Sequence, residues 1–573
     1  MARRIKLFFN LILSGVLFAY FILILILLLN PYIHLGNDEF FRLFRHLVFF
    51  YGPLWSFILG IIFFIIQFFA EKKYPIGIIS PPTLTYFLSF TILLVSIIFY
   101  LNYDYYYLFF YPLLKAKFIK LLLAKLLLII IAIIFVFFKR IEKKWSQFAF
   151  LALLALDIFV SYNTVLSNGH IYQEIKQPVA IPRKIPFFWN TDLLVRPGQD
   201  PTQENLPPAP PPQRKIRIVI MDGLSLNLIQ TLSSEEKLLN FRLLSNQGVR
   251  GKVITFIPNL DLSLINSALT GLYPSQFTFH SSHRYKFIES GHEFDIFPRY
   301  IFFRNSSILD ITSFYKKDNH IVDHIDKYYE KNSYKTSSLL ESYPVPRYSR
   351  KSLARNSAFV LRFSEILKKD DPKYTILKKA FFLDDHLKNI IPNLKDSDKC
   401  YAVTHFPGLG IISKYFYQYH DPDQLFSSIP ETDIKKYGLI IEKYYDYYDS
   451  IIGNLMSTTG DNELLVILSF FEYEPLPVWR RILVNLYGEN DVYVYKSLQS
   501  QGTIFLYEKN ALKQGYPLKS ISIFDIFPTL VYYAGFQLSR DLEGGVIKEI
   551  FSEEFQLKNP IDINTEYPGK LDR

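Results

Sequence analysis

Cysteine is almost missing from the sequence, which has a single one, Cys400, among 573 residues. One cysteine excludes a disulfide framework within the chain and a zinc site built from cysteines. The sequence also lacks an internal repeat and a glycine-rich phosphate loop. No nucleic-acid-binding motif accompanies the net charge of +10, so we expect no nucleic-acid partner.

Long apolar runs, in contrast, are abundant near the N-terminus. Half of the chain is hydrophobic, and it contains 53 phenylalanines and 41 tyrosines. A transmembrane helix needs about 20 apolar residues, and five stretches reach that length, roughly 5–29, 48–70, 83–101, 118–138 and 147–166. The sequence therefore predicts a membrane region over residues 1–168 with about five transmembrane helices. The first stretch is too long for a cleaved signal peptide, so we expect it to remain as an anchor.

Basic residues predict the orientation of these helices. They lie before the first stretch, after the second, and between the fourth and fifth, at Arg3, Arg4, Lys6, Lys72, Lys73, Lys139, Arg140, Lys143 and Lys144. The positive-inside rule places these positions, and the N-terminus, in the cytoplasm. The loops at 34–46 and 102–117 and the C-terminal part then lie outside. We expect a multi-pass protein of the cell (inner) membrane with a periplasmic or extracellular domain.

Two ionisable residues fall inside the predicted spans, Lys125 in the fourth and Asp157 in the fifth. A charge within the membrane is costly and marks a candidate functional site. Alternatively, Lys125 reaches the interface with its long side chain, and Asp157 is buried against a neighbouring helix. The sequence leaves open whether either residue handles a substrate.

Residues 169–214 are predicted to form a linker. They contain the run NLPPAPPPQRK, and consecutive prolines favour an extended, semi-rigid conformation. We therefore expect a spacer between the membrane region and an outer domain over residues 215–573.

The outer domain opens with a pattern typical of a buried parallel strand. Residues 216–221 are apolar except for Arg217, and Asp222 and Gly223 follow them. Ser225 can cap a helix through the 226–244 region, and a second strand is predicted at 253–257. A carboxylate at the end of such a strand lies where open α/β sheets bind ligands, which makes Asp222 a candidate site residue.

Several phrases of the outer domain resemble the alkaline phosphatase superfamily, in its type I phosphodiesterase and nucleotide pyrophosphatase branch. They are IVIMDG, LLSNQGV, PNLD and TGLYP near the start, SIIGNLM with NELLVILS later, and ISIFDIFPTLVYYAGF with DLEGGVI near the end. The resemblance implies a mostly parallel sheet between helices. It also implies two metal ions, usually zinc, and a threonine or serine nucleophile.

By this resemblance, two site positions of the family correspond to acidic residues of this chain. Asp222 keeps the first metal-ligand position, and Asp261 stands at the nucleophile position, a departure from the family. A carboxylate can be a nucleophile in phosphoryl transfer. Ser263 could replace it only if the loop shifted.

The remaining ligand positions do not hold the aspartates and histidines of the family, and two of them hold phenylalanines, which cannot bind a metal. Leu409 and Ser413 stand where the family has an aspartate and a histidine, and Phe470 and Phe471 stand in the second such motif. No histidine occurs after His420, although the family takes two histidine ligands from this third. We therefore expect the two-metal centre to be missing. No cofactor is expected, and zinc only if the domain is active.

Histidines in the middle of the chain offer no better metal site. His280, His283 and His292 lie close in sequence, and His320 and His324 have helical spacing. An i, i+4 pair can bind a metal, but no third ligand is evident. We predict that these are surface histidines.

Three hypotheses for function remain, with membrane lipids and an envelope-assembly protein as expected partners. The favoured one is an inactive phosphodiesterase-like protein that acts as a binding, scaffold or regulatory component in envelope lipid or glycan assembly. The second is an active phosphodiesterase or phosphotransferase that uses a divergent site on phospholipid head groups or envelope polymers. The third is a lipid-handling membrane region gated by the outer domain.

Overall fold

The structure is a computed structural model, and its described residues form two compact units. The helical unit comprises Met1–Arg183 with Thr278–Phe314, and the α/β unit comprises Lys184–Phe277 with Tyr315–Arg573. Of the predicted linker, only Arg214 lies within the described residues. The structure describes residues 2–33, 35–73, 84–110, 112–137, 144–166, 214–277, 280, 283–287, 292–299, 309–313, 329–330, 334–339, 357–391, 394, 398–420, 429–475, 494–496, 501–540 and 542–564.

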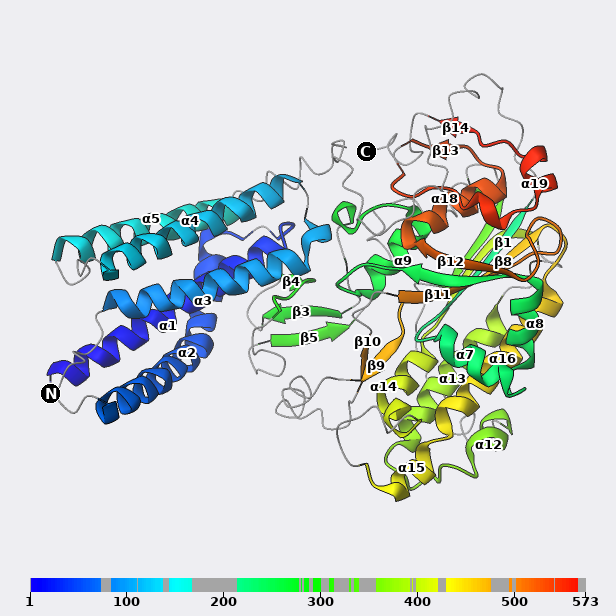
Figure 1. Ribbon diagram of the computed structural model, residues 1–573, viewed down its shortest axis with the longest axis horizontal. Helices are drawn as coiled ribbons and strands as arrows, with labels where there is room; N and C mark the ends of the chain where they lie inside the picture. The colour runs from blue at the N-terminus through cyan, green and yellow to red at the C-terminus, as the bar shows by residue number, and fades with distance from the viewer. Residues whose placement is uncertain are drawn as a thin grey trace. The chain divides into compact units, whose positions relative to one another are not determined.

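Five long helices form most of the helical unit (Figure 1). All five are long and apolar enough to cross a membrane, as the sequence predicts. Their orientation in the membrane stays a prediction. The helices are α1 (Ala2–Leu29), α2 (Asn37–Lys73), α3 (Leu84–Tyr105), α4 (Pro112–Phe137) and α5 (Lys144–Leu166).

Two predicted loops are largely helical instead. Helix α2 begins at Asn37, eleven residues before the predicted span, with Asp38 and Glu39 in its first turn, where acidic side chains favour a helix N-terminus. The second predicted loop, 102–117, contains the end of α3, the short helix η1 (Tyr107–Phe109) and the start of α4 at Pro112. Proline is well suited to a first helical position. A search for apolar stretches long enough to span a membrane does not detect these polar helix ends.

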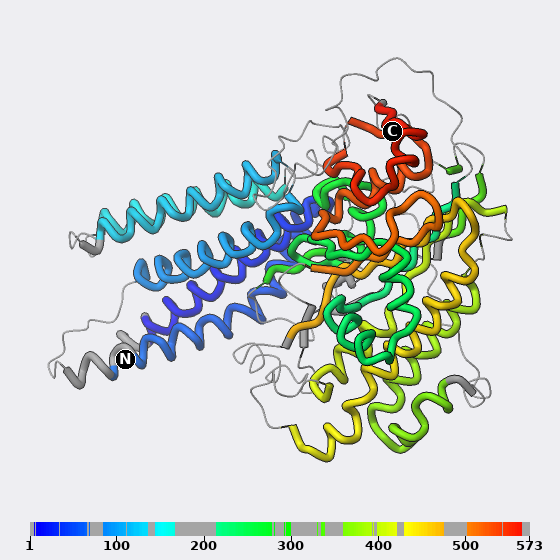
Figure 2. Tube along the Cα trace, turned by 45° about the vertical axis from the view of Figure 1, so that its right-hand side comes forward, coloured from blue at the N-terminus to red at the C-terminus, as the bar shows by residue number. Residues whose placement is uncertain are grey.

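Close packing joins the first three helices. A Cβ atom on Gly15 would lie 2.3 Å from the carbonyl oxygen of Gly52, so α1 and α2 approach as only small residues allow. The indole Nε1 of Trp55 donates to Thr91 Oγ1 of α3 at 3.0 Å. Helix α4 packs against α3, and α5 lies beside α4 (Figure 2).

A segment from the second half of the chain completes the helical unit at the helix ends. The Asn30 side chain, after α1, accepts from the amides of Asp295 and Ile296 at 3.0 Å each and donates to the Ile296 carbonyl at 2.7 Å. Asn102 of α3 makes the equivalent pair of bonds to the Arg299 backbone, at 2.7 and 3.0 Å. Both asparagines are buried, so the backbone they bind is an integral part of this unit.

The same segment contains a small antiparallel sheet and three of the middle histidines, His280, His283 and His292. Its strands are β3 (His283–Phe287), β4 (Glu293–Phe294) and β5 (Leu309–Ser313). The prediction of surface histidines is wrong for His280, which is buried against Phe109, with ring centroids 4.9 Å apart. Burial lowers the pKa of His280 to about 3. His292 is partly exposed and pairs with Glu39 at 3.2 Å. His320 and His324 lie outside the described residues.

A seven-stranded sheet forms the centre of the α/β unit, in the order β12-β2-β11-β8-β1-β7-β6 (Figure 1). All pairs are parallel except the two made by β11. The sheet is therefore mixed but mostly parallel, as the sequence predicts. Its strands are β1 (Lys215–Met221), β2 (Val249–Ile254), β6 (Lys335–Leu339), β7 (Lys399–Phe406), β8 (Glu463–Ser469), β11 (Gln501–Tyr507) and β12 (Tyr516–Ser522).

Helices cover both faces of this sheet, which confirms the predicted fold class. Helices α7, α8, α13, α14 and α16 pack on one face, and α9 and α18 on the other (Figure 1). The helices are α7 (Leu226–Ser234), α8 (Leu239–Gln247), α9 (Asp261–Thr270), α12 (Ser357–Phe363), α13 (Tyr374–Ile390), α14 (Gly408–His420), α15 (Glu431–Tyr437), α16 (Ile440–Thr458), α18 (Ile523–Ala534) and α19 (Glu553–Lys558). Short elements are η3 (Pro274–Gln276), η6 (Lys548–Ile550), β9 (Tyr473–Pro475), β10 (Val494–Lys496), β13 (Leu538–Ser539) and β14 (Ile563–Asn564).

The start of the domain agrees with its predicted elements apart from their bounds. Strand β1 matches the prediction, and Ser225 caps α7 by accepting from the Leu228 amide at 3.4 Å. The predicted helix over 226–244 is two helices, because Glu236 adopts a positive φ of 61° between them. Strand β2 begins four residues earlier than predicted, at Val249.

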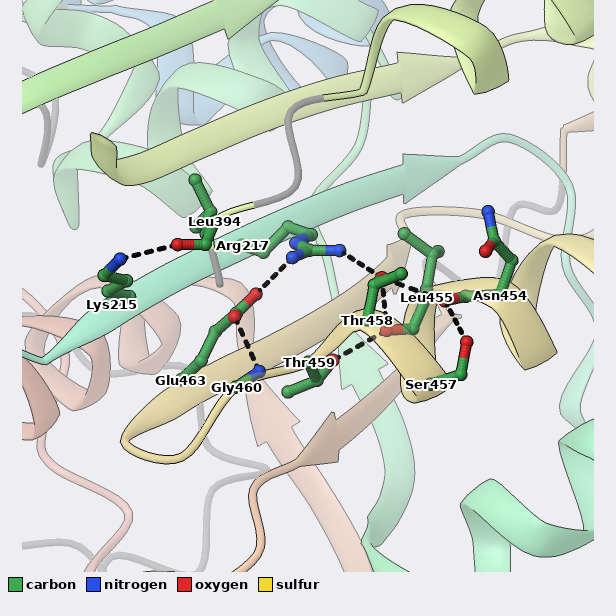
Figure 3. A network of polar contacts seen from close by, with 10 residues as sticks. All are labelled: Lys215, Arg217, Leu394, Asn454, Leu455, Ser457, Thr458, Thr459, Gly460 and Glu463. Carbon is green, nitrogen blue, oxygen red and sulfur yellow. Dashed lines mark hydrogen bonds and ion pairs between the residues drawn. The ribbon is translucent and has the colours of Figure 1, made fainter. Parts of the chain in front are cut away.

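Arg217, the one charge inside β1, forms an ion pair within the sheet (Figure 3). Its guanidinium lies 2.6 Å from the Glu463 carboxylate on β8, and the two side chains are 2% and 0% exposed. Thr458 accepts from the guanidinium at 3.0 Å, and the Gly460 amide donates to the carboxylate at 2.9 Å. This pair aligns β1 with β8 at their N-terminal ends.

Breaking the Arg217–Glu463 pair should destabilise the sheet strongly. Glu463→Gln leaves a buried guanidinium without its counter-charge, which costs about 3–5 kcal/mol. We expect hydrogen exchange of β1 and β8 amides in the full-length protein to accelerate accordingly. The control is Asp461→Asn, which removes an exposed pair with Lys509 at 2.9 Å and should cost at most about 1 kcal/mol. Equal effects of the two variants would contradict a structural role for the buried pair.

Candidate functional site at the carboxyl ends of the parallel strands

Asp222 directly follows β1, between β7 and β8. Its amide donates to the Phe406 carbonyl of β7 at 3.1 Å. The next residues are held from the other side, since the Leu224 amide donates to Ser469 Oγ of β8 at 3.1 Å. Gly223 has a φ of 79°, a left-handed conformation that glycine adopts readily. Asp222 is therefore held by backbone pairing at the edge where such sheets bind ligands.

The side chain of Asp222 pairs with His405, a residue that the sequence reasoning missed. The distance from His405 Nε2 to Asp222 Oδ1 is 2.9 Å, and the side chains are 7% and 19% exposed. Ile220 lies opposite His405 in the parallel register of β1 and β7. The signal in the sequence is THFPGLG, in which the histidine is the last residue but one of β7 (Lys399–Phe406). This carboxylate therefore has a protein partner.

The two predicted ligand positions after His405, Leu409 and Ser413, both have buried side chains. Leu409 is fully buried and Ser413 is 3% exposed. The residue of α14 that approaches Asp222 is Gly410, where an added Cβ would lie 2.8 Å from Asp222 Cβ. No side chain fits between α14 and Asp222 at this point, so this helix brings no ligand to Asp222.

The residues after β8 are apolar or engaged elsewhere. Phe470 and Phe471 are each 2% exposed, and Phe471 packs edge-on against Tyr473, with ring centroids 5.6 Å apart. The Glu472 carboxylate accepts from Ser225 Oγ and from the Leu226 amide, at 3.3 Å each. Burial raises the pKa of Glu472. Glu472 thus stabilises the start of α7.

Tyr473 lies close to both acidic candidates. Burial raises the pKa of its phenol, and the charges of Asp222 and Asp261 raise it further. Asp261 is the first residue of α9, where the helix dipole favours a carboxylate. Ser263, one turn into α9, is fully buried. The structure thus brings Asp222, His405, Tyr473 and Asp261 into one neighbourhood.

A two-metal centre does not fit the residues found here. Zinc sites need several nitrogen, oxygen or sulfur ligands around each ion. Among the described residues, no group of three or more histidines, cysteines, aspartates or glutamates is arranged to hold a metal. At the strand ends, Asp222 is paired with His405 and the neighbouring positions are occupied by Gly410 and Phe471.

A buried acid of α13 contacts residues next to the candidate site. Asp384 of α13 accepts from the hydroxyls of Tyr444 and Tyr448 at 2.7 and 2.8 Å and from the Gly408 amide at 3.1 Å. Burial raises the pKa of Asp384 to about 7, although these bonds and the nearby His405 favour its charged form. Asp384 therefore fixes the turn that follows His405.

The intramembrane candidates Lys125 and Asp157 form a buried pair in the helical unit. The lysine Nζ lies 3.3 Å from Asp157 Oδ2 and 3.3 Å from Ser161 Oγ. It also lies over the rings of Phe21 of α1 and Phe99 of α3, at 4.3 and 5.2 Å. Lys125 is fully buried, so the alternative in which it extends to the interface is wrong. The pair joins α4 and α5 to α1 and α3.

Comparisons with known proteins found similarity among solved structures alone. No protein-family model matches the chain, and no curated protein matches it. Among solved structures, murine ectonucleotide pyrophosphatase/phosphodiesterase 5, in an inactive form with AMP, is similar to 59% of this chain over 100% of its own, with 11% identity and a TM-score of 0.36.

A second similar structure is the phosphonate monoester hydrolase of Silicibacter pomeroyi. It covers 62% of this chain and 78% of its own, with 12% identity and a TM-score of 0.32.

Titration of Asp384 should make stability depend on pH. A pKa raised in the folded state from 3.8 to about 7 means that folding favours the protonated acid, so this contribution is present below about pH 4 and is lost as the pH rises through about 7. It corresponds to roughly 4 kcal/mol. Hydrogen exchange at α13 and α14 should show the stability of wild type falling relative to Asp384→Asn across this range. A constant difference between the two proteins would show that Asp384 does not titrate there.

Variants of the Lys125–Asp157 pair distinguish a structural role of these two charges from a functional one. Asp157→Leu leaves a buried ammonium ion unpaired and should strongly reduce the amount of folded protein in membranes. Lys125→Leu with Asp157→Leu removes both charges and should restore it. If the double variant folds but fails to complement a strain that lacks the protein, the charges have a functional role beyond packing.

Proposed function

We propose that this protein is a membrane-anchored, catalytically inactive relative of phosphodiesterases. It acts as a binding, scaffold or regulatory component in cell-envelope lipid or glycan assembly. Its helices hold it in the membrane, and its α/β unit presents the former active-site edge to a partner outside the cytoplasm. Membrane lipids and an envelope-assembly protein are the proposed partners.

The observation that carries this proposal is the pairing of Asp222 with His405 beside apolar packing. A catalytic metal ion needs about three protein ligands around it, and Asp222 and His405, whose side chains lie 2.9 Å apart, supply two. Phe470 and Phe471, which follow the neighbouring strand β8, are buried and apolar. The edge of the sheet keeps its architecture, whereas the side chains suit binding better than metal-assisted hydrolysis.

A second candidate function is supported by the charges around Tyr473. The charges of Asp222 and Asp261 both raise the pKa of the Tyr473 phenol, so two carboxylates lie near this side chain at the sheet edge. Such an arrangement could hold one metal ion with further ligands from outside the described residues. The protein would then be a phosphodiesterase or phosphotransferase with a divergent site.

Size-matched and bulky substitutions distinguish the two candidates. Asp222→Asn and Asp261→Asn keep the shape of the edge and remove its charge. Under the binding role we expect both variants to complement a strain that lacks the protein. Asp261→Trp projects a large side chain from the start of α9 and should abolish complementation by blocking the partner.

The opposite pattern would overturn the binding role. If Asp261→Asn or Asp222→Asn loses complementation by a factor of ten or more while the protein remains folded, the divergent-site enzyme is supported. Circular dichroism and expression level in membranes serve as the folding controls for all three variants.

A further inference from the structure

An apolar groove runs between α5 and the helices α1 and α2 of the helical unit. Its volume is about 500 Å³, within the range of ligand pockets. Leu13 and Leu17 of α1, Phe41 and Phe44 of α2, and Ala155 and Phe159 of α5 are among its lining residues. Helix α5 lies mainly against α4 (Figure 2), which leaves this space open on its other side.

The chemistry of the walls restricts what can bind there. Only two lining side chains carry a polar group, Tyr20 and Tyr162. The Tyr20 hydroxyl donates to the Ile158 carbonyl at 2.6 Å, and the Tyr162 hydroxyl donates to Asn37 Oδ1 at 2.8 Å. Both hydroxyls are thus engaged between helices. A ligand in the groove is therefore apolar along its length, because a polar one would lose hydrogen bonds to water.

Size argues against a protein segment as the occupant. A helix is about 10 Å in diameter with a pitch of about 5.4 Å, so a volume of about 500 Å³ holds roughly one turn. A helix from a second copy would bury little of itself here. A single hydrocarbon chain, in contrast, is thin enough to extend along the groove.

The groove is continuous with the surface that faces the hydrophobic part of the membrane. Phe41 and Phe159, at its edges, are 57% and 61% exposed, and they belong to helices long and apolar enough to span a bilayer. We propose that this groove is a binding site for one hydrocarbon chain of a membrane lipid. The two tyrosine hydrogen bonds fix the spacing of α5 from α1 and α2, and this spacing sets the width of the site. The inference concerns the helical unit alone and does not rest on the proposed function.

Photolabelling in vesicles tests this site. The full-length protein is reconstituted in palmitoyl-oleoyl phosphatidylcholine with a small fraction of a phosphatidylcholine that carries a diazirine in one acyl chain. We expect labelled peptides to concentrate on the groove-lining parts of α1, α2 and α5. Ala155→Phe fills the groove and should reduce this labelling at least fivefold.

The matched control is Ala149→Phe, the same change on the same helix. Ala149 is exposed and does not line the groove, and it lies about 120° around the helix from Ala155. Labelling of the groove should stay at the wild-type level. Ala155→Leu is a smaller change that should give a partial reduction if the phenylalanine variant fails to fold.

Two results would overturn the proposal. One is labelling spread evenly over the exposed faces of all five helices and unchanged by Ala155→Phe and Ala155→Leu, which indicates ordinary boundary lipid only. The other is lipid labelling that occurs on the exposed helix faces but is absent from the groove-lining peptides of the wild type, which indicates that no lipid chain enters the groove.

Discussion

Strand β1 pairs in parallel with β7 on one side and with β8 on the other, and this pairing determines where the candidate residues at the ends of these three strands lie. The carboxyl ends of parallel strands meet at one edge of a sheet, so the registers bring Asp222, His405 and the residues after Ser469 together. At the opposite end, the Arg217–Glu463 pair aligns the same strands. A charged pair buried at this depth tolerates little change in register, because each partner would lose its only counter-charge.

The chemistry at this edge follows from which side chains the pairing brings there. Asp222 and His405 supply one carboxylate and one imidazole, 2.9 Å apart, and the phenylalanines that follow β8 contribute packing instead of charge. Gly410 allows α14 to approach Asp222 so closely that no ligand fits between them. The side chains at this edge are therefore compatible with a role in binding. The helical unit has its own polar contacts, and its Lys125–Asp157 pair acts between helices in the same way as the Arg217–Glu463 pair acts between strands.

Much of the architecture could be predicted because its signals are local. The length of the apolar stretches indicates the five helices, and the apolar run before Asp222 indicates β1. The capping role of Ser225 also follows from its position. The polar ends of α2 and α4 were missed, because apolar length says nothing about them. His405 and Tyr473 could not be assigned to the site, since their roles depend on strand register and on the packing of α14. Similarly, nothing near Asn30 or Asn102 in sequence indicates that they bind the backbone of residues 295–299.

Metal content tests whether the sheet edge around Asp222 lacks the ligands for a two-metal centre. Elemental analysis is made on the purified full-length protein after equilibration with zinc, manganese and magnesium and removal of free ions. We expect no tightly bound metal in the wild type and no difference for Asp222→Asn. Two metals per chain that disappear in Asp222→Asn would contradict this expectation and would place a functional metal centre at this edge.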